Sequence, residues 1–234
     1  VEKPVTETVA QAEALIELAN ARGLVFQVGH LERFNPAVLA LRPLLTRPTR
    51  IEARRMAVYK QRGTEVDVVL DMMIHDIDIA LSLVDSDVVG IEASGAIVVS
   101  GDIDLAQATL RFANGCVAEI AASRVNLEPV RAMTVHQEKS YITVDFANHA
   151  LLVGSVEPGG RLGTPRDASV ETLALTRSDA LMDEIRSFIS AVNEGRSPTV
   201  SGEDGKRALA VAVAVSQAIH RTLARPAPPR AELG

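Results

Sequence analysis

Apolar residues near the start of the chain recur at helical spacing, which predicts a helix over residues 8–22. Thr8 and Gln11 fit a capping box at its start, and Gly23 stands where a C-terminal glycine is expected. The apolar run at residues 24–28 then predicts a short buried strand. One helix followed by one strand cannot form a sheet alone, so we expect this unit to be the end of a larger parallel sheet.

The next hundred residues change from helical to alternating periodicity. Helices are predicted at residues 36–45 and 66–84, with a strand at 49–59 between them. From residue 88 to about 153 the apolar positions alternate with polar ones, and Asn114-Gly115 supplies a favoured hairpin turn. Strands are expected at 117–125, 130–137, 140–146 and 149–154. The pattern predicts a mostly antiparallel sheet with one face to cover.

The C-terminal part returns to helices. A Gly- and Pro-containing loop at 159–167 precedes an amphipathic helix at 179–193. Ser201 and Asp204 fit a capping box at the start of the last helix. That helix is apolar on most of its surface, and we expect part of it to stay exposed in this chain. The Pro-rich residues 225–234 are expected to be a disordered tail.

Composition narrows the function classes. The 234 residues carry a net charge of -6 and no Trp, which argues against a nucleic-acid-binding protein. No apolar stretch is long enough to span a bilayer, so no membrane partner is expected. Cys116 is the single cysteine, which fits a reducing cytoplasm. The chain opens without Met or a signal peptide, and we expect a missing beginning.

Glu2-Lys3-Pro4 is the first motif that could carry chemistry. Proline fixes the backbone and can hold Lys3 in a defined geometry. A lysine in a dry site beside a cationic ring loses part of its preference for the charged form and can enter proton transfer. The alternative is a solvated terminal lysine.

Asp71, His75 and Asp78 form the second motif. Spacings of four and three put them on one face of the predicted helix. His75 is a candidate general base, and Asp71 could orient the imidazole and favour its protonated form. One alternative is an ordinary polar helix face, and another is a divalent-metal site for a hydrolase or lyase. The metal interpretation is weaker because all three ligands would come from one helix, with few ligands from other parts of the chain to surround the ion.

Two basic or polar clusters could bind substrate. Arg33 and Asn35 follow the strand at 24–28, where ligands bind in parallel sheets, and could contact a phosphate and a hydroxyl. Asn35 could equally cap the next helix. Arg54 belongs to a basic run suited to an anionic small molecule, although a solvated strand edge explains most of its members. The run comprises Arg47, Arg50, Arg54, Arg55, Lys60 and Arg62.

In their order along the chain, these motifs resemble the glucose-fructose oxidoreductase / inositol dehydrogenase (Gfo/Idh/MocA) family. The matching segments are Glu2-Lys3-Pro4, residues 29–36, residues 71–78 and residues 200–205. The sequence around Arg33 and His75, together with residues 112–116 and 123–125, resembles the sequences of a bacterial subfamily, the UDP-N-acetylglucosamine 3-dehydrogenases. Some members of this subfamily act in making amino-sugar lipid A.

The resemblance implies an α/β (α+β) fold and a division of the chain. Residues 1–30 would be the C-terminal remnant of a truncated dinucleotide-binding Rossmann domain, and residues 31–224 the catalytic, substrate-binding and oligomerisation domain with an open sheet flanked by helices. The Gly-rich turn of the family is not in this sequence. The fragment is therefore expected to bind a dinucleotide poorly and to be inactive without that segment.

The resemblance also implies the reaction: hydride transfer from a secondary alcohol of a sugar or sugar nucleotide to NAD or NADP. Lys3, Asp71 and His75 would be catalytic, with Glu2, Lys3 and Pro4 near the cofactor. Arg33, Asn35, Arg54 and Asp78 would contact the substrate, and no metal is required. We expect a cytoplasmic homo-oligomer formed through the sheet face. Alternatives are another sugar or cyclitol as substrate, or a sugar-nucleotide-binding or scaffold module without catalysis.

Overall fold

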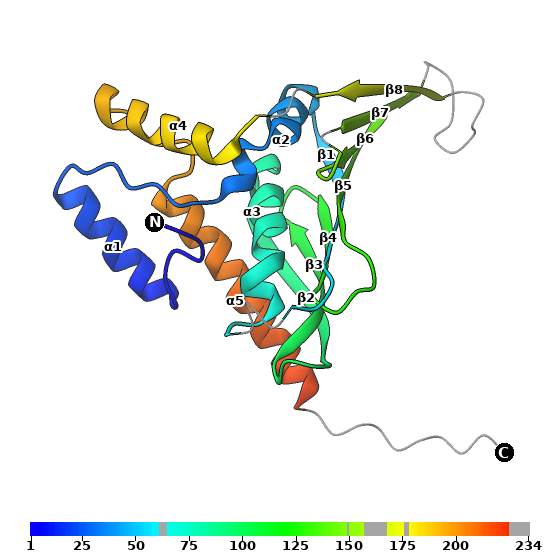
Figure 1. Cartoon of the computed structure of the whole chain (residues 1–234), viewed down its shortest axis with the longest axis horizontal. Helices are drawn as coiled ribbons and strands as arrows, with labels where there is room; N and C mark the ends of the chain where they lie inside the picture. Colours follow the sequence, from blue (N-terminus) through cyan, green and yellow to red (C-terminus); the bar gives the residue numbers. More distant parts are fainter. Residues whose placement is uncertain (61–64, 149, 157–167, 176–177, 225–234) are drawn as a thin grey trace.

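The computed structural model describes residues 1–60, 65–148, 150–156, 168–175 and 178–224 (Figure 1). The tail predicted at 225–234 and the loop predicted at 159–167 lie outside the described residues, as do Arg62 and His149. The main element of the fold is one eight-stranded sheet. Its strands are β1 (Pro48–Met56), β2 (Val88–Ile97), β3 (Ile103–Phe112), β4 (Val117–Ser123), β5 (Val130–Gln137), β6 (Ser140–Asp145), β7 (Ala150–Val156) and β8 (Ala168–Ala174).

The strand order is β2-β3-β4-β1-β5-β6-β7-β8, and β1 and β4 are the one parallel pair in this sheet. All other neighbouring strands are antiparallel, which confirms the predicted open, mostly antiparallel sheet. Gly115 has a φ of 89°, and the amide of Cys116 donates to the Asn114 side chain, so the Asn-Gly turn joins β3 and β4 as predicted. Strand β8 was not predicted from the sequence.

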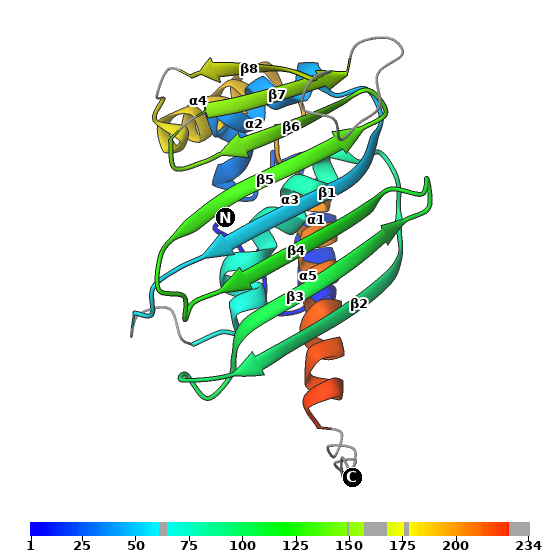
Figure 2. The same ribbon diagram turned by 90° about the vertical axis from the view of Figure 1, so that its right-hand side faces the viewer.

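Helices cover one face of this sheet (Figure 2). Helix α3 contacts β1 and β4, α5 contacts β2, and α2 contacts β6 and β7, while the turn η3 contacts β3 and β4. Helix α1 packs on α5, farther from the sheet, and α4 lies beside α2 (Figure 1). The helices are α1 (Val9–Ala21), α2 (Pro36–Leu41), α3 (Ile74–Leu83), α4 (Ala180–Glu194) and α5 (Gly202–Leu223), with 3-10 turns η1 (Leu31–Phe34) and η2 (Arg42–Leu44) and the π-helical turn η3 (Val69–Met73).

The capping predictions are confirmed at both ends of the chain. Thr8 and Gln11 form a capping box on α1, and Ser201 and Asp204 form another on α5. The helix predicted at 66–84 is instead a π-helical turn that runs into α3, a form common at functional sites. The strand predicted at 24–28 is reduced to isolated bridges, with Glu2 parallel to Gly29 and Gln27 antiparallel to Ser201.

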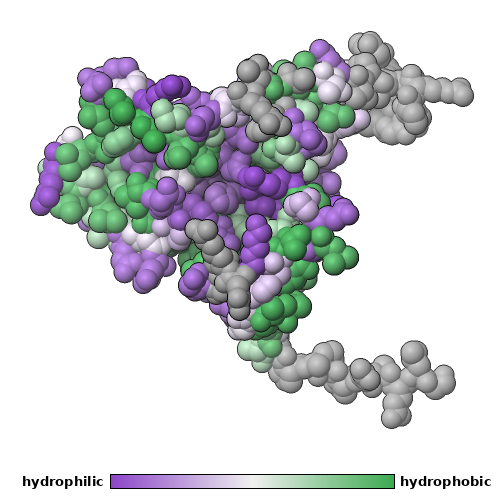
Figure 3. Space-filling model, viewed as in Figure 1, coloured by the Kyte–Doolittle hydropathy of each residue, from purple (hydrophilic) through white to green (hydrophobic). Residues whose placement is uncertain are grey.

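The expectation that α5 leaves apolar surface exposed holds only at its last residue, Leu223, which is 41% exposed. Most of its apolar side chains pack between α1, α3 and β2, and Ala208, Leu209, Ala212, Val215 and Ile219 are fully buried. Exposed apolar surface gathers over α1 and α4, and also at the lower right of the view in Figure 3. None of the helices in the described part of the chain is long and apolar enough to cross a membrane.

Candidate active site

Lys3 lies where the N-terminal segment crosses the π-helical turn η3. The backbone of Gly29 donates to the carbonyl of Val1, which fixes the segment that carries Lys3. The Lys3 ammonium donates to the backbone carbonyl of Asp71, and its Nζ lies 3.6 Å from the Asp71 carboxylate. Burial lowers the pKa of Lys3 below its ordinary value, although Asp71 opposes this shift. The structure therefore places Lys3 in a partly dry site rather than in bulk solvent.

His75 stands at the start of α3, directly after η3. Burial, together with the nearby charges of Arg55 and Lys3, lowers the pKa of His75 well below its ordinary value. The imidazole is therefore neutral at neutral pH and can accept a proton. Its Nδ1 is buried and has no hydrogen-bond partner among the described residues.

The expected role of Asp71 needs correction. We expected its carboxylate to orient His75 and favour the protonated form, but it pairs with Lys3, and the pKa of His75 shifts in the opposite direction. The π-helical turn changes the phase of the helix between residues 71 and 75, and this phase is not visible in a spacing of four. Asp71 contacts the ammonium of Lys3 rather than the imidazole.

Arg33 and Asp78 are brought together as a buried pair. Arg33 Nε and Nη2 donate to the two carboxylate oxygens of Asp78 at 2.6 and 2.9 Å. Asn35 is also buried, and its side chain accepts from Ala37 N at 3.0 Å, which makes it the N-cap of α2. All three side chains thus have protein partners, and their contacts with substrate stay predictions.

Arg54 and Arg55 point to opposite faces of β1. Arg54 lines a hollow on the sheet face away from the helices, so the structure does not bring it to His75. Arg55 is buried on the helix side and donates to both oxygens of Asp76, at 2.8 and 3.0 Å, and to Glu32 at 3.0 Å. Successive side chains of a strand alternate between faces, which is why neighbouring arginines have unrelated surroundings.

Four residues that were not expected from the sequence to act in the site join it: His30, Glu32, Asp76 and Arg131. Glu32 accepts from Arg55, Asn35 and Arg131, and Asp76 is the second acceptor for Arg55. His30 is 1% exposed, and neither of its ring nitrogens has a hydrogen-bond partner among the residues that the structure describes. Burial lowers the pKa of His30, so it too is neutral at neutral pH.

Asp71, His75 and Asp78 do not converge as metal ligands. Asp78 is held by Arg33, and Asp71 by Lys3. Within the described ranges, ligand atoms of three such residues come within 4.8 Å of one another only at Asp67, Asp102 and His220. Asp67 there already accepts from two backbone amides and from Ser216.

A neutral imidazole beside a partly buried ammonium can take a proton from an alcohol and stabilise the developing oxyanion. These groups lie beside the π-helical turn η3, and the segment that carries Lys3 forms the parallel bridge between residues 2 and 29. Groups of this kind suit an oxidoreductase, because oxidation of an alcohol releases a proton from its hydroxyl.

Comparisons with known proteins agree with this class. The sequence model of the GFO/IDH/MocA C-terminal domain matches residues 42–143. UDP-N-acetylglucosamine 3-dehydrogenase of Acidithiobacillus ferrooxidans is 38% identical over 228 residues, which are 96% of this chain and 72% of that enzyme. Myo-inositol 2-dehydrogenase of Thermotoga maritima is 28% identical over 93% of this chain and 69% of the relative.

Solved structures show the same fold. A structure of the Acidithiobacillus ferrooxidans enzyme has a TM-score of 0.90 at 38% identity and covers 96% of this chain and 72% of its own. Levoglucosan dehydrogenase in complex with NADH reaches a TM-score of 0.80 at 17% identity, covering 94% of this chain and 70% of its own. The chain belongs to the GFO/IDH/MocA family of NAD(P)-dependent dehydrogenases.

Proposed function

We propose that this chain carries the substrate side of a dehydrogenase that oxidises the 3-hydroxyl of UDP-N-acetylglucosamine. The proposal rests on Lys3, which Asp71 holds at the π-helical turn, and on His75, which follows that turn with a buried Nδ1 that has no hydrogen-bond partner among the described residues. The choice of substrate is supported by the 38% identity to the Acidithiobacillus ferrooxidans enzyme of that name, against 28% to the inositol dehydrogenase.

The proton of the substrate hydroxyl passes to His75, either directly or through Lys3. The Lys3 ammonium stabilises the negative charge that develops on the oxygen while the carbonyl forms. Asp71 keeps Lys3 in place through its backbone carbonyl and its carboxylate. The charge of Lys3 is among those that lower the pKa of His75, so removal of this charge should also change the titration of the imidazole.

A nicotinamide dinucleotide, NAD or NADP, supplies the hydride acceptor when bound. Glu2, Lys3 and Pro4 would lie beside it, because Glu2 forms the parallel bridge with Gly29 and the other two residues follow directly in the chain. The residues present fit such a polar molecule. The buried ring nitrogens of His30 have no hydrogen-bond partner in the described part of the chain, although Nδ1 lies 3.9 Å from Asp78, and can bond to polar groups placed near Lys3.

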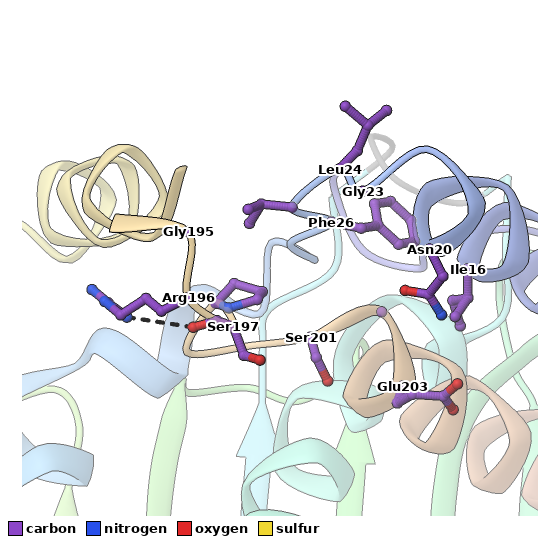
Figure 4. A pocket seen from close by; sticks show the side chains of 13 residues that line it. Ile16, Asn20, Gly23, Leu24, Phe26, Gly195, Arg196, Ser197, Ser201 and Glu203 are labelled. Atoms are coloured by element: carbon purple, nitrogen blue, oxygen red, sulfur yellow. Dashed lines mark hydrogen bonds between the residues drawn. The ribbon is translucent and has the colours of Figure 1, made fainter. Parts of the chain in front are cut away.

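We further propose that residues 1–30 belong to a dinucleotide-binding domain and residues 31–224 to the catalytic domain. Leu15, Leu18 and Leu24 are exposed, and Leu24 lines a hollow between residues 16–26 and residues 195–203 (Figure 4). On the other side α4 exposes a whole apolar stripe. That stripe consists of Leu181, Ile185, Phe188, Ile189 and Val192. Helices on both sides of strand segments are typical of a parallel sheet.

A substrate panel tests the proposed function. In a polypeptide with a dinucleotide-binding domain before Val1, UDP-N-acetylglucosamine is expected to reduce NAD or NADP with a kcat/KM at least about 100-fold above that of myo-inositol and N-acetylglucosamine. The readout is the absorbance of the reduced nicotinamide. Equal or higher activity with myo-inositol would assign the site to cyclitols instead.

The face of the sheet away from the helices supports a proposed homo-oligomer. It holds a hollow of about 500 Å³ lined by Arg54, Leu105 and Gln107, among others, and in Figure 2 no helix of the described chain lies over it. Arg54→Glu is expected to reduce the sedimenting mass toward the monomer, because it places like charges beside Glu52 and Glu119 in this hollow. Arg186→Glu, on exposed α4, is the control. An unchanged mass for the Arg54 variant would move the interface elsewhere.

A further inference from the structure

The arginines on the helix-covered side of the sheet differ in their exposure and in how many of their N–H groups donate hydrogen bonds to the protein. Arg33 and Arg55 are 6% and 5% exposed, and each gives two parallel hydrogen bonds to one aspartate. The side chain of Arg131 is 45% exposed. Its guanidinium donates to Glu32 and to no other described residue, although an arginine has five N–H donors.

Arg131 shares a sheet face with Arg55. The two residues stand directly opposite each other in the antiparallel pair β1–β5, and such cross-strand partners project to the same side. Arg55 contacts Asp76 next to His75, so this side is the one that faces the helices. Both guanidinium groups meet on the same oxygen of Glu32.

Glu32 holds Arg131 in place and leaves other N–H groups of its guanidinium available. The carboxylate is 9% exposed and also accepts from Asn35 at 3.1 Å. Burial alone would raise the pKa of Glu32, but Arg55 and Arg131 outweigh it and hold the pKa below its ordinary value. Glu32 therefore stays charged and anchors the guanidinium of Arg131, which still has free donors on its exposed side.

Arg131 is linked to the helix that carries His75 through two contacts. It donates to Glu32, which also accepts from Arg55, and Arg55 donates to Asp76, the residue after His75. A half-exposed, pre-oriented guanidinium suits a planar, bidentate contact with a phosphate oxygen pair. Arg33, which the sequence favoured for this contact, is closed off by Asp78.

We propose that Arg131 binds the anionic group of the substrate, the diphosphate of a nucleotide sugar, and so selects nucleotide sugars over neutral sugars and cyclitols. This assignment rests on the proposed function, since it presumes a substrate oxidised at His75. Glu32 is the positioning residue for Arg131. The neutral end of the substrate then lies toward Lys3 and His75.

The test compares Arg131→Gln with the unchanged protein. We expect the KM for UDP-N-acetylglucosamine to rise about 10- to 100-fold, the loss of one charge-assisted contact, while kcat changes less than about threefold. Arg131→Lys retains the charge but not the fork and should fall between the two. Arg111→Gln is the matched control, because Arg111 is a half-exposed strand arginine paired with one glutamate, Glu92.

Calorimetric titration of the 234-residue chain with UDP, with no cofactor present, gives a second readout. The same 10- to 100-fold loss of affinity is expected for Arg131→Gln, with a weaker dependence on salt. Unchanged KM and unchanged UDP affinity would overturn the assignment even if the enzyme oxidises UDP-N-acetylglucosamine. Arg131-dependent UDP binding without oxidation of that sugar would instead overturn the proposed reaction and leave the anion site standing.

Discussion

His75→Asn is expected to lower kcat for alcohol oxidation by about 1,000-fold, within the usual range for loss of a general base. Asparagine keeps a polar side chain of similar size but cannot take up the substrate proton. The affinity for UDP should stay within about threefold, because the diphosphate contact lies elsewhere. Single-turnover hydride transfer, which isolates the chemical step, is the measurement.

The pH dependence separates His75 from Lys3. Only neutral His75 accepts a proton, and its pKa lies well below the ordinary value of 6.5, so kcat/KM should stay flat through neutral pH and fall only in acid. Lys3→Met removes one of the charges that lower this pKa, so the acid limb should move to higher pH while the rate also falls.

His136→Asn is the control for this series, because His136 is a strand histidine that faces Glu52. It should leave both rate and pH profile unchanged. Retention of a normal chemical step in both His75→Asn and Lys3→Met would show that the proton leaves by another route.

Arg55→Met is expected to lower the free energy of unfolding by about 3–5 kcal/mol. The guanidinium is buried and bonds to two buried carboxylates, those of Glu32 and Asp76. Without it, Asp76 has no cation paired to it among the described residues, and Glu32 keeps only Arg131. Urea unfolding followed by circular dichroism measures the loss.

The loss of unfolding free energy in Arg55→Met should become smaller in acid. The pKa of Glu32 in the folded protein is below its ordinary value of 4.5, so its ion pairs contribute stability above that value and lose it as the pH falls. In Arg55→Met, burial of Glu32 is opposed by one charge fewer, so this carboxylate becomes neutral at a higher pH than in the unchanged protein, which narrows the difference in the free energy of unfolding. Arg50→Met, on the same strand with Glu52 and Glu119 as partners, is the control and should change the midpoint little. A similar loss in both variants would contradict a special role for burial.

Local signals in the sequence predict much of the fold. The capping boxes at Thr8 and Ser201 and the turn at Gly115 depend on short-range hydrogen bonds and backbone freedom, which neighbouring residues reveal. The burial of α5 depends on helices and strands far away in the sequence, so its apolar surface alone could not show what covers it.

The site was predicted in part. The charge of Lys3 is among those that lower the pKa of His75, but the catalytic roles given to both residues stay predictions. The π-helical turn that redirects Asp71 leaves no spacing signal. Arg55 and Arg131 do have a spacing signal. Arg55 stands two residues after Ala53 and four after Ile51, which are buried, and Arg131 stands two residues before Met133 and four before Val135, which are also buried. An arginine in an apolar register points inward, and inward arginines need buried acids.

The central claim is that His75 and Lys3 serve the oxidation of one carbinol, the 3-position of a nucleotide sugar. Transfer of deuterium tests it most directly. With UDP-N-acetylglucosamine deuterated only at carbon 3, mass spectrometry should find the label in the reduced nicotinamide, with a slower single-turnover rate than for the unlabelled sugar. Unlabelled reduced nicotinamide, or product oxidised at another carbon, would contradict the account.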